Sequence, residues 1–265
     1  MVAGVVTTSE KSKPENLEVL LSSFILYFLF SFLISKGMSI FVQLAAGLLL
    51  VATVSYATLA LGKKVMTFSL ALFLAFVAAS LLSWEFGILL GLAGIQFIFI
   101  FLPMHAERKW LSIFAEYGVQ IPETAPVFFK LALRCILLLG VLAISYVLLI
   151  LLLNQFGLND LANITAVLGR IPLYLILVPA LTTAFAEEIF FRGFLLRRFG
   201  ILASSVLFMF SHVAYGSLTE LAVAFLVGLI FCAYVKRTRD LTAPIIVHFA
   251  VNAASIAVNY GLIGL

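Results

Sequence analysis

The sequence has few charged residues. Only 11% of its 265 residues are Asp, Glu, Lys or Arg, whereas about 25% are charged in an ordinary soluble domain. Hydrophobic residues make up 64%, which excludes a soluble globular protein. The apolar runs are about 20 residues long, the length of a membrane-spanning helix and not of a barrel strand. The sequence therefore predicts an all-α fold, a polytopic transmembrane helical bundle.

Cysteine is also scarce. The two cysteines, Cys135 and Cys232, both lie inside apolar runs. A pair in this setting indicates small core side chains and excludes a disulfide framework or a cysteine metal site. No internal repeat, Gly/Ser linker or low-complexity tract divides the chain.

The apolar runs predict about nine spans. Residues 1–16 form a polar lead, and an accessory four-helix membrane region covers 17–103. Its four spans are 17–35, 39–61, 66–82 and 86–103. A cytoplasmic loop, 104–126, precedes the predicted functional core, 127–265, which holds nearly all the ionisable residues found within spans. Its five spans are 127–153, 171 to Gly200, 201–215, 221–235 and from Pro244 to the C-terminus.

The distribution of positive charge supports this span count. If the N-terminus is cytoplasmic, fourteen of the sixteen Lys and Arg residues fall on the inner side, and only Lys36 and Arg170 fall outside. Positive residues are enriched in cytoplasmic loops. We therefore expect an integral membrane protein with the N-terminus cytoplasmic and the C-terminus outside. Short loops and the lack of targeting segments favour a prokaryotic plasma membrane.

An acidic motif lies near the end of the sixth apolar run. Its residues Glu187 and Glu188 are adjacent, and Arg192 follows. Charges at this depth are costly and usually functional. On an α-helix, Glu188 and Arg192 are i, i+4 neighbours that neutralise each other. Glu187 lies about 100° away around the helix, so it lacks this local partner and is available for chemistry.

Two further helices carry polar residues at membrane depth. In the seventh span, Phe208 lies one turn before His212 on the same face. In the ninth span, His248 and Asn252 are i, i+4 and point to one side. Polar side chains in a membrane bundle face inward. We therefore expect the catalytic groups of three helices in the C-terminal half to converge.

These residue types are suited to hydrolysis. Glu187 can act as a general base on water, with an imidazole sharing the proton. A His–Asn pair can donate hydrogen bonds to a developing oxyanion. No serine or cysteine has an obvious base one turn away. Alternatively, Glu187, His212 and His248 supply the ligand types of a catalytic Zn²⁺ site, although no helix carries two histidines that bracket a glutamate.

In type, order and spacing, the three motifs resemble those of the CPBP intramembrane proteases. This family includes the CAAX prenyl endopeptidases and the bacteriocin-processing or immunity proteins. The resemblance covers about residues 127–265. It implies that the site residues are Glu187, Glu188, Arg192, His212, His248 and Asn252.

The resemblance also implies a role for each residue. Glu187 and His212 would activate water, and His248 with Asn252 would form the oxyanion site. Arg192 would hold Glu188 in place. Both a metalloenzyme and a metal-free glutamate protease are compatible with these residues.

The leading hypothesis is therefore an intramembrane endopeptidase. Its partners would be membrane lipid and a membrane-associated protein or peptide substrate, prenylated or not, and no nucleic acid. One alternative is a proton-coupled transporter that uses Glu and His as a relay, although the paired repeats of many transporters are absent. Another is a catalytically silent membrane partner or immunity protein.

The topology is testable with a reporter fused after Leu265. Nine spans from a cytoplasmic N-terminus place this residue outside. An alkaline phosphatase fusion should therefore be active and a fluorescent protein fusion dark. The opposite result would contradict the count of nine and indicate that the seventh or eighth span does not cross.

Overall fold

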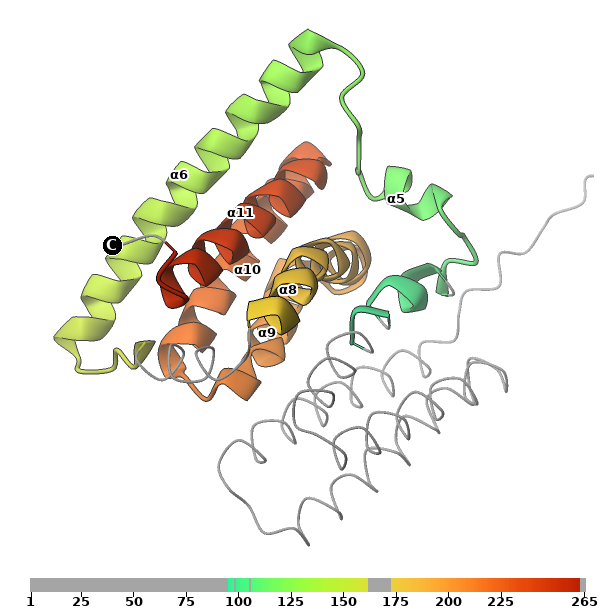
Figure 1. The fold of residues 1–265 in the computed structure, drawn as a ribbon. Helices are drawn as coiled ribbons and strands as arrows, with labels where there is room; N and C mark the ends of the chain where they lie inside the picture. Colours follow the sequence, from blue (N-terminus) through green and yellow to red (C-terminus); the bar gives the residue numbers. More distant parts are fainter. Residues whose placement is uncertain (1–94, 98, 105, 162–172, 263–265) are drawn as a thin grey trace, which may run out of the picture.

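The part of the chain that the structure describes is helical, without strands (Figure 1). The structure, a computed structural model, describes residues 95–97, 99–104, 106–161 and 173–262. The all-α prediction is confirmed for these residues. The polar lead and nearly all of the accessory region lie outside them, so the count of nine spans stays a prediction.

The helices of this part are numbered as in Figure 1. They are α5 (Ser112–Glu116), α6 (Ala125–Gln155), α8 (Leu173–Glu187), the π-helix η1 (Glu188–Leu195), α9 (Leu196–Ser211), the 3₁₀ helix η2 (Val213–Tyr215), α10 (Leu218–Thr238) and α11 (Thr242–Asn259). A shorter apolar helix covers 95–104.

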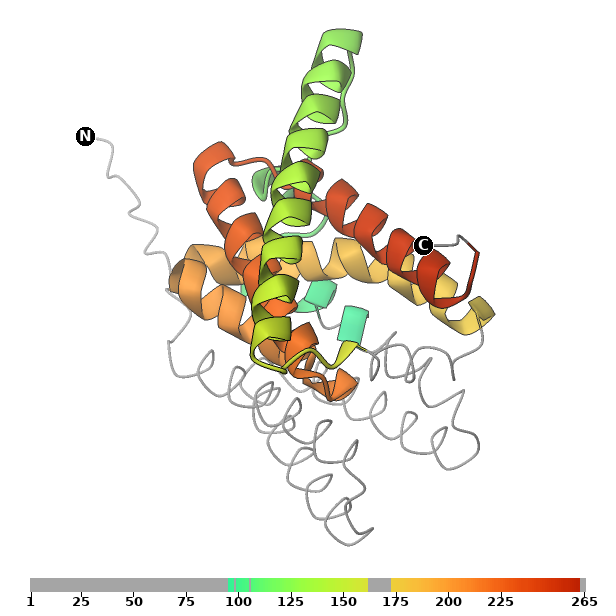
Figure 2. The ribbon, with the colours of Figure 1, turned by 90° about the vertical axis from the view of Figure 1, so that its left-hand side faces the viewer.

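Four helical segments in the described part are long and apolar enough to cross a membrane. They are Ala125–Gln155, Thr182–Ser211, Leu218–Thr238 and Thr242–Asn259. The first, α6, lies along α10 and α11 (Figures 1 and 2). On their other sides α10 packs against α9, and α11 packs against α8. Helices of this length and composition are those of an integral membrane protein.

The second of these segments is folded back on itself at Gly200. This glycine has φ 80° and ψ −177°, a conformation that is essentially restricted to glycine. Phe191 and Phe208 would lie about 26 Å apart on a straight helix, yet their ring centroids are 5.1 Å apart. The Ser204 hydroxyl also donates a hydrogen bond to the Phe191 carbonyl, at 2.6 Å. The predicted separation of two helices at Gly200 is therefore confirmed.

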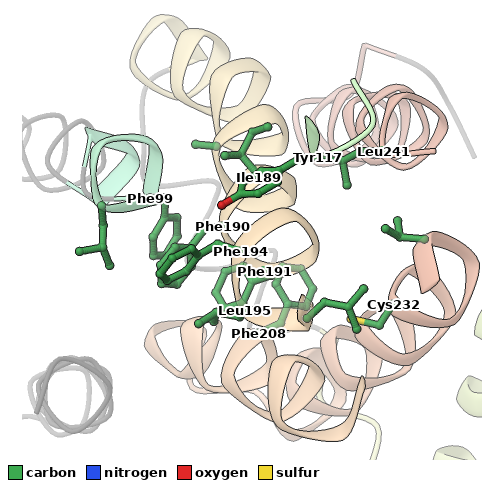
Figure 3. Close-up of a cluster of buried hydrophobic side chains, with 14 of the residues drawn as sticks. Phe99, Tyr117, Ile189, Phe190, Phe191, Phe194, Leu195, Phe208, Cys232 and Leu241 are labelled. Atoms are coloured by element: carbon green, nitrogen blue, oxygen red, sulfur yellow. The ribbon is translucent and has the colours of Figure 1, made fainter. Parts of the chain in front are cut away.

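The main buried cluster is rich in phenylalanine (Figure 3). Most of its members come from η1, α9 and α10, but Phe99, Ile113 and Tyr117 belong to segments before residue 127. Ile113 and Tyr117 lie in the predicted cytoplasmic loop and are nevertheless buried. Residues before 127 thus contribute to the core around η1.

The segment 106–120 is attached to the rest of the protein by polar contacts. Arg198 and Glu107 form an ion pair at 2.8 Å. The Leu241 amide donates to the Gly118 carbonyl at 3.0 Å, and the Gln120 amide donates to the Thr242 hydroxyl at 2.8 Å. These contacts fix the segment to the start of α9 and to the α10–α11 turn.

Asp160 caps the N-terminus of α10. Its carboxylate accepts hydrogen bonds from the Ser217 hydroxyl at 2.6 Å and from the amides of Leu218 and Thr219 at 2.9 Å. Burial alone would raise the pKa of Asp160, but these hydrogen bonds hold it well below its ordinary value. The cap therefore stabilises the fold above the ordinary pKa of an aspartate, and this contribution is lost as the pH falls below it.

Gly193 provides a test of the packing around η1. A Cβ atom added there would lie 2.2 Å from the Tyr117 ring, so Gly193→Ala should destabilise the protein by about 1–3 kcal/mol. Thermal unfolding in detergent should show a lower Tm. The matched control is Gly140→Ala on α6, because a Cβ there meets nothing within 4 Å. Equal melting of the two variants would contradict this account of the Tyr117 contact.

Candidate active site

The acidic motif lies where α8 changes into the π-helix. Glu187 is the last residue of α8, and η1 begins at Glu188. The sequence predicts a continuous α-helix here, and this detail is wrong. A π-helix has i→i+5 hydrogen bonds and a wider turn, so successive side chains diverge by less than the roughly 100° of an α-helix. Both carboxylates approach the same side chain, His248 on α11.

The predicted ion pair between Glu188 and Arg192 is confirmed. Arg192 Nη1 donates to Glu188 Oε1 at 2.8 Å, and both side chains are fully buried. The guanidinium carbon lies 4.0 Å from the centre of the Phe208 ring and 5.2 Å from that of Phe231. The faces of aromatic rings attract cations. Arg192 is thus held by one carboxylate and two rings from α9 and α10.

His248 on α11 contacts both carboxylates. Its Nδ1 lies 2.9 Å from Glu188 Oε1, and its Nε2 lies 3.7 Å from Glu187 Oε2. A carboxylate oxygen accepts hydrogen bonds, so Nδ1–H is the donor to Glu188. The sequence predicts that Glu187 lacks a local partner, and it places His248 in the oxyanion site or, in the zinc alternative, beside Glu187 and His212. This prediction missed the Glu188 contact, since nothing local signals a contact between residues 60 positions apart.

The two carboxylates differ in their hydrogen bonding. Glu188 Oε1 has two partners, Arg192 and His248. The Oε2 atoms of both glutamates are buried and have no hydrogen-bond partner among the described residues. That of Glu187 lies 3.7 Å from His248 Nε2, which is too long for a hydrogen bond. Buried polar atoms in proteins are almost always paired. An unpaired carboxylate oxygen beside an imidazole is therefore an acceptor available to a substrate or a water molecule.

His212 lies at the C-terminal end of α9. Its Nδ1 is 3.0 Å from the Phe208 carbonyl oxygen, which can only accept, so Nδ1–H is the donor and Nε2 is the acceptor of the neutral ring. The Phe208 ring lies 4.7 Å from the His212 ring and 6.0 Å from the His248 ring, centre to centre. Phe208 thus contacts residues of all three motifs, since Arg192 lies over its face. Asn252 is half-buried on α11, one turn after His248.

Sequence reasoning missed Tyr215 as a member of this region. Its ring stacks on His212 with centres 6.0 Å apart. Burial raises the pKa of the Tyr215 hydroxyl, and the charges of Glu220 and Glu187 raise it further. The only local signal is an aromatic residue three positions after His212.

The geometry does not fit the zinc alternative. In the described part of the chain, no three His, Cys, Asp or Glu side chains are grouped closely enough to hold a metal ion. Glu187, His212 and His248 are thus not arranged as the three protein ligands of a catalytic zinc site.

Comparison with known proteins identifies one family. Residues 169–254 match the family model described as Rce1-like, type II CAAX prenyl endopeptidase. The matched segment includes all three motifs, from Glu187 to Asn252. No curated protein and no solved structure matches the chain.

The buried ion pair makes a prediction about folding. Glu188→Gln should leave the Arg192 guanidinium buried without a compensating charge, which typically costs about 3–5 kcal/mol. The amount of protein in the membrane and the Tm in detergent should both fall. The double variant Glu188→Gln with Arg192→Gln should recover part of both.

The exposed pair of Lys109 and Glu116 is the matched control, with an N–O distance of 2.7 Å. Glu116→Gln should change stability by no more than about 1 kcal/mol, because exposed ion pairs contribute little. If Glu188→Gln behaves like Glu116→Gln, the fold does not depend on the buried pair.

Proposed function

We propose that this chain is an intramembrane endopeptidase, because residues 169–254 match the Rce1-like family of type II CAAX prenyl endopeptidases. The family is one of proteases, and the apolar helices place the chain in a membrane. The substrate would be a membrane-associated protein or peptide. A prenylated CAAX-type C-terminus is the first substrate to test.

The observation that carries the proposal is the unequal environment of two adjacent buried carboxylates. Glu188 Oε1 is hydrogen-bonded to Arg192 and His248, whereas the contact of Glu187 Oε2 with His248, at 3.7 Å, is too long for a hydrogen bond. A paired carboxylate is a poor base because its charge is already compensated. Glu187 is therefore the general base, and Glu188 is a positioning residue that orients His248.

The reaction begins with a water molecule within hydrogen-bond reach of Glu187 Oε2. Glu187 accepts a proton from the water, and the water oxygen attacks the carbonyl carbon of the scissile peptide bond. His212 orients the same water through Nε2, because its Nδ1–H already donates to the Phe208 carbonyl. The attack moves the carbonyl π electrons onto oxygen and gives a tetrahedral oxyanion.

The oxyanion then needs hydrogen-bond donors. His248 and the Asn252 amide lie one helical turn apart on α11 and can donate to it together. His248 donates from Nε2 only as the imidazolium, since its Nδ1 donates to Glu188.

Collapse of the oxyanion completes the hydrolysis. The carbonyl re-forms and the C–N bond breaks. Glu187, now a carboxylic acid, returns its proton to the leaving amine. The products are one peptide with a new C-terminal carboxylic acid and one with a free N-terminal amine, and Glu187 is ionised again.

The central test is cleavage by the purified protein in liposomes. A farnesylated CAAX peptide and its unprenylated counterpart would be followed by mass spectrometry, which also identifies the cleaved bond. Glu187→Gln keeps the size of the side chain but removes the base, so the rate should fall about 10²–10⁴-fold. Asn252→Ala should lower it about 10²–10³-fold, the cost of losing an oxyanion donor.

Two controls accompany this test. Glu123→Gln changes an exposed glutamate that is far in sequence from the three motifs, so it should leave the rate unchanged. A chelator should also leave it unchanged, because the proposed mechanism activates water with Glu187. Near-wild-type cleavage by Glu187→Gln would show that the base lies elsewhere.

A further inference from the structure

The helix at 95–104 contacts the catalytic helix although it lies outside the segment that matches the family. The side-chain amide of Gln96 makes two hydrogen bonds there. Its Nε2 donates to Thr183 Oγ1 at 2.5 Å, and its Oε1 accepts from Thr182 Oγ1 at 2.7 Å. A polar side chain in an apolar helix is costly unless it is paired. Gln96 is thus satisfied by two adjacent hydroxyls of α8.

The same helix makes an aromatic contact one turn further on. Phe99 is almost completely buried, and its ring stacks on Phe190 with centres 4.5 Å apart. It also meets the edge of the Phe191 ring at 5.2 Å. Figure 3 shows Phe99 pointing from its helix toward Phe190 and Phe191. Gln96 and Phe99 are i, i+3 neighbours and therefore share one face.

These contacts lie on both sides of Glu187 along the helix. Thr183 is one turn before Glu187, and Phe190 and Phe191 are about one turn after it. Between them α8 changes into η1. π-Helical turns are rare in proteins and are often found at functional sites. A rotation of α8 about its axis would move the Glu187 carboxylate away from His248. The hydrogen bonds of Gln96 oppose that rotation.

We propose that Gln96 is a positioning residue for Glu187, and that Gln96 and Phe99 together brace the junction of α8 and η1. This inference rests on the proposed function, because it assigns Gln96 an effect on catalysis. A general base must lie within hydrogen-bond reach of its proton, and a displacement of about 1 Å can cost about 10²-fold in rate. The accessory region would thus contribute directly to the active site.

Gln96→Leu removes both hydrogen bonds and keeps a side chain of similar bulk. The expected result in the liposome assay is a kcat about 10-fold or more below wild type, with KM unchanged. Thr183→Val should lower kcat in the same direction. The double variant should be no worse than the poorer single one, because both changes break the same contact. The matched control is Gln155→Leu, at the exposed end of α6, which should keep wild-type kcat.

Hydrogen exchange measured by mass spectrometry gives a readout that does not depend on activity. In Gln96→Leu, amides of residues 183–195 should exchange faster, while those of α10 should be unchanged. Faster exchange throughout the protein would overturn the proposal, because Gln96 would then support the fold in general.

The outcomes separate this inference from the proposed function. If wild type cleaves peptide and Gln96→Leu keeps its kcat, the brace is wrong and the protease assignment stands. If neither the wild-type protein nor Glu187→Gln cleaves any of the peptides, the proposed function fails. The exchange of residues 183–195 then decides alone whether Gln96 holds the junction, and unchanged exchange would overturn it.

Discussion

The buried ion pair between Glu188 and Arg192 is the interaction on which the rest of the structure depends. Both side chains are fully excluded from solvent, and such charges are tolerated at membrane depth only when they are compensated. Compensation comes from other helices: α9 supplies Phe208, α10 supplies Phe231, and α11 supplies His248. Satisfying one ion pair therefore fixes the relative positions of four helical segments.

Small residues make this convergence possible. Gly200 reverses the chain, so that α9 returns along η1 and brings Phe208 onto Arg192. Gly228 lies so close to Ser205 that an added Cβ would be 3.0 Å from the Ser205 backbone, which brings α9 and α10 together. Close backbone approach through small residues is typical of membrane helix packing. The aromatic side chains then fill the space around the charges.

The two buried glutamates differ in their hydrogen-bond partners, and the proposed function depends on this difference. Glu188 is hydrogen-bonded to Arg192 and His248, while Glu187 Oε2 lies 3.7 Å from His248, beyond hydrogen-bond distance. Under the proposed function, these two adjacent residues take different roles because only Glu188 has an arginine and a histidine within hydrogen-bond distance. The helix at 95–104 also contacts this region. Its residues Gln96 and Phe99 pack on the junction of α8 and η1, although they lie outside the segment that matches the family.

The features that could be predicted from the sequence depend on residues close together in the chain. Apolar length and scarce charge predict membrane helices, i, i+4 spacing predicts the Glu188–Arg192 contact, and Gly200 predicts a break, because each depends on neighbouring residues only. The tertiary structure decided the rest. His248 meets both glutamates, Gln96 meets Thr183, and residues 188–195 form a π-helix, a conformation that packing from other segments supports. Contacts between residues 60 or 87 positions apart depend on how helices pack together, and no local pattern specifies that.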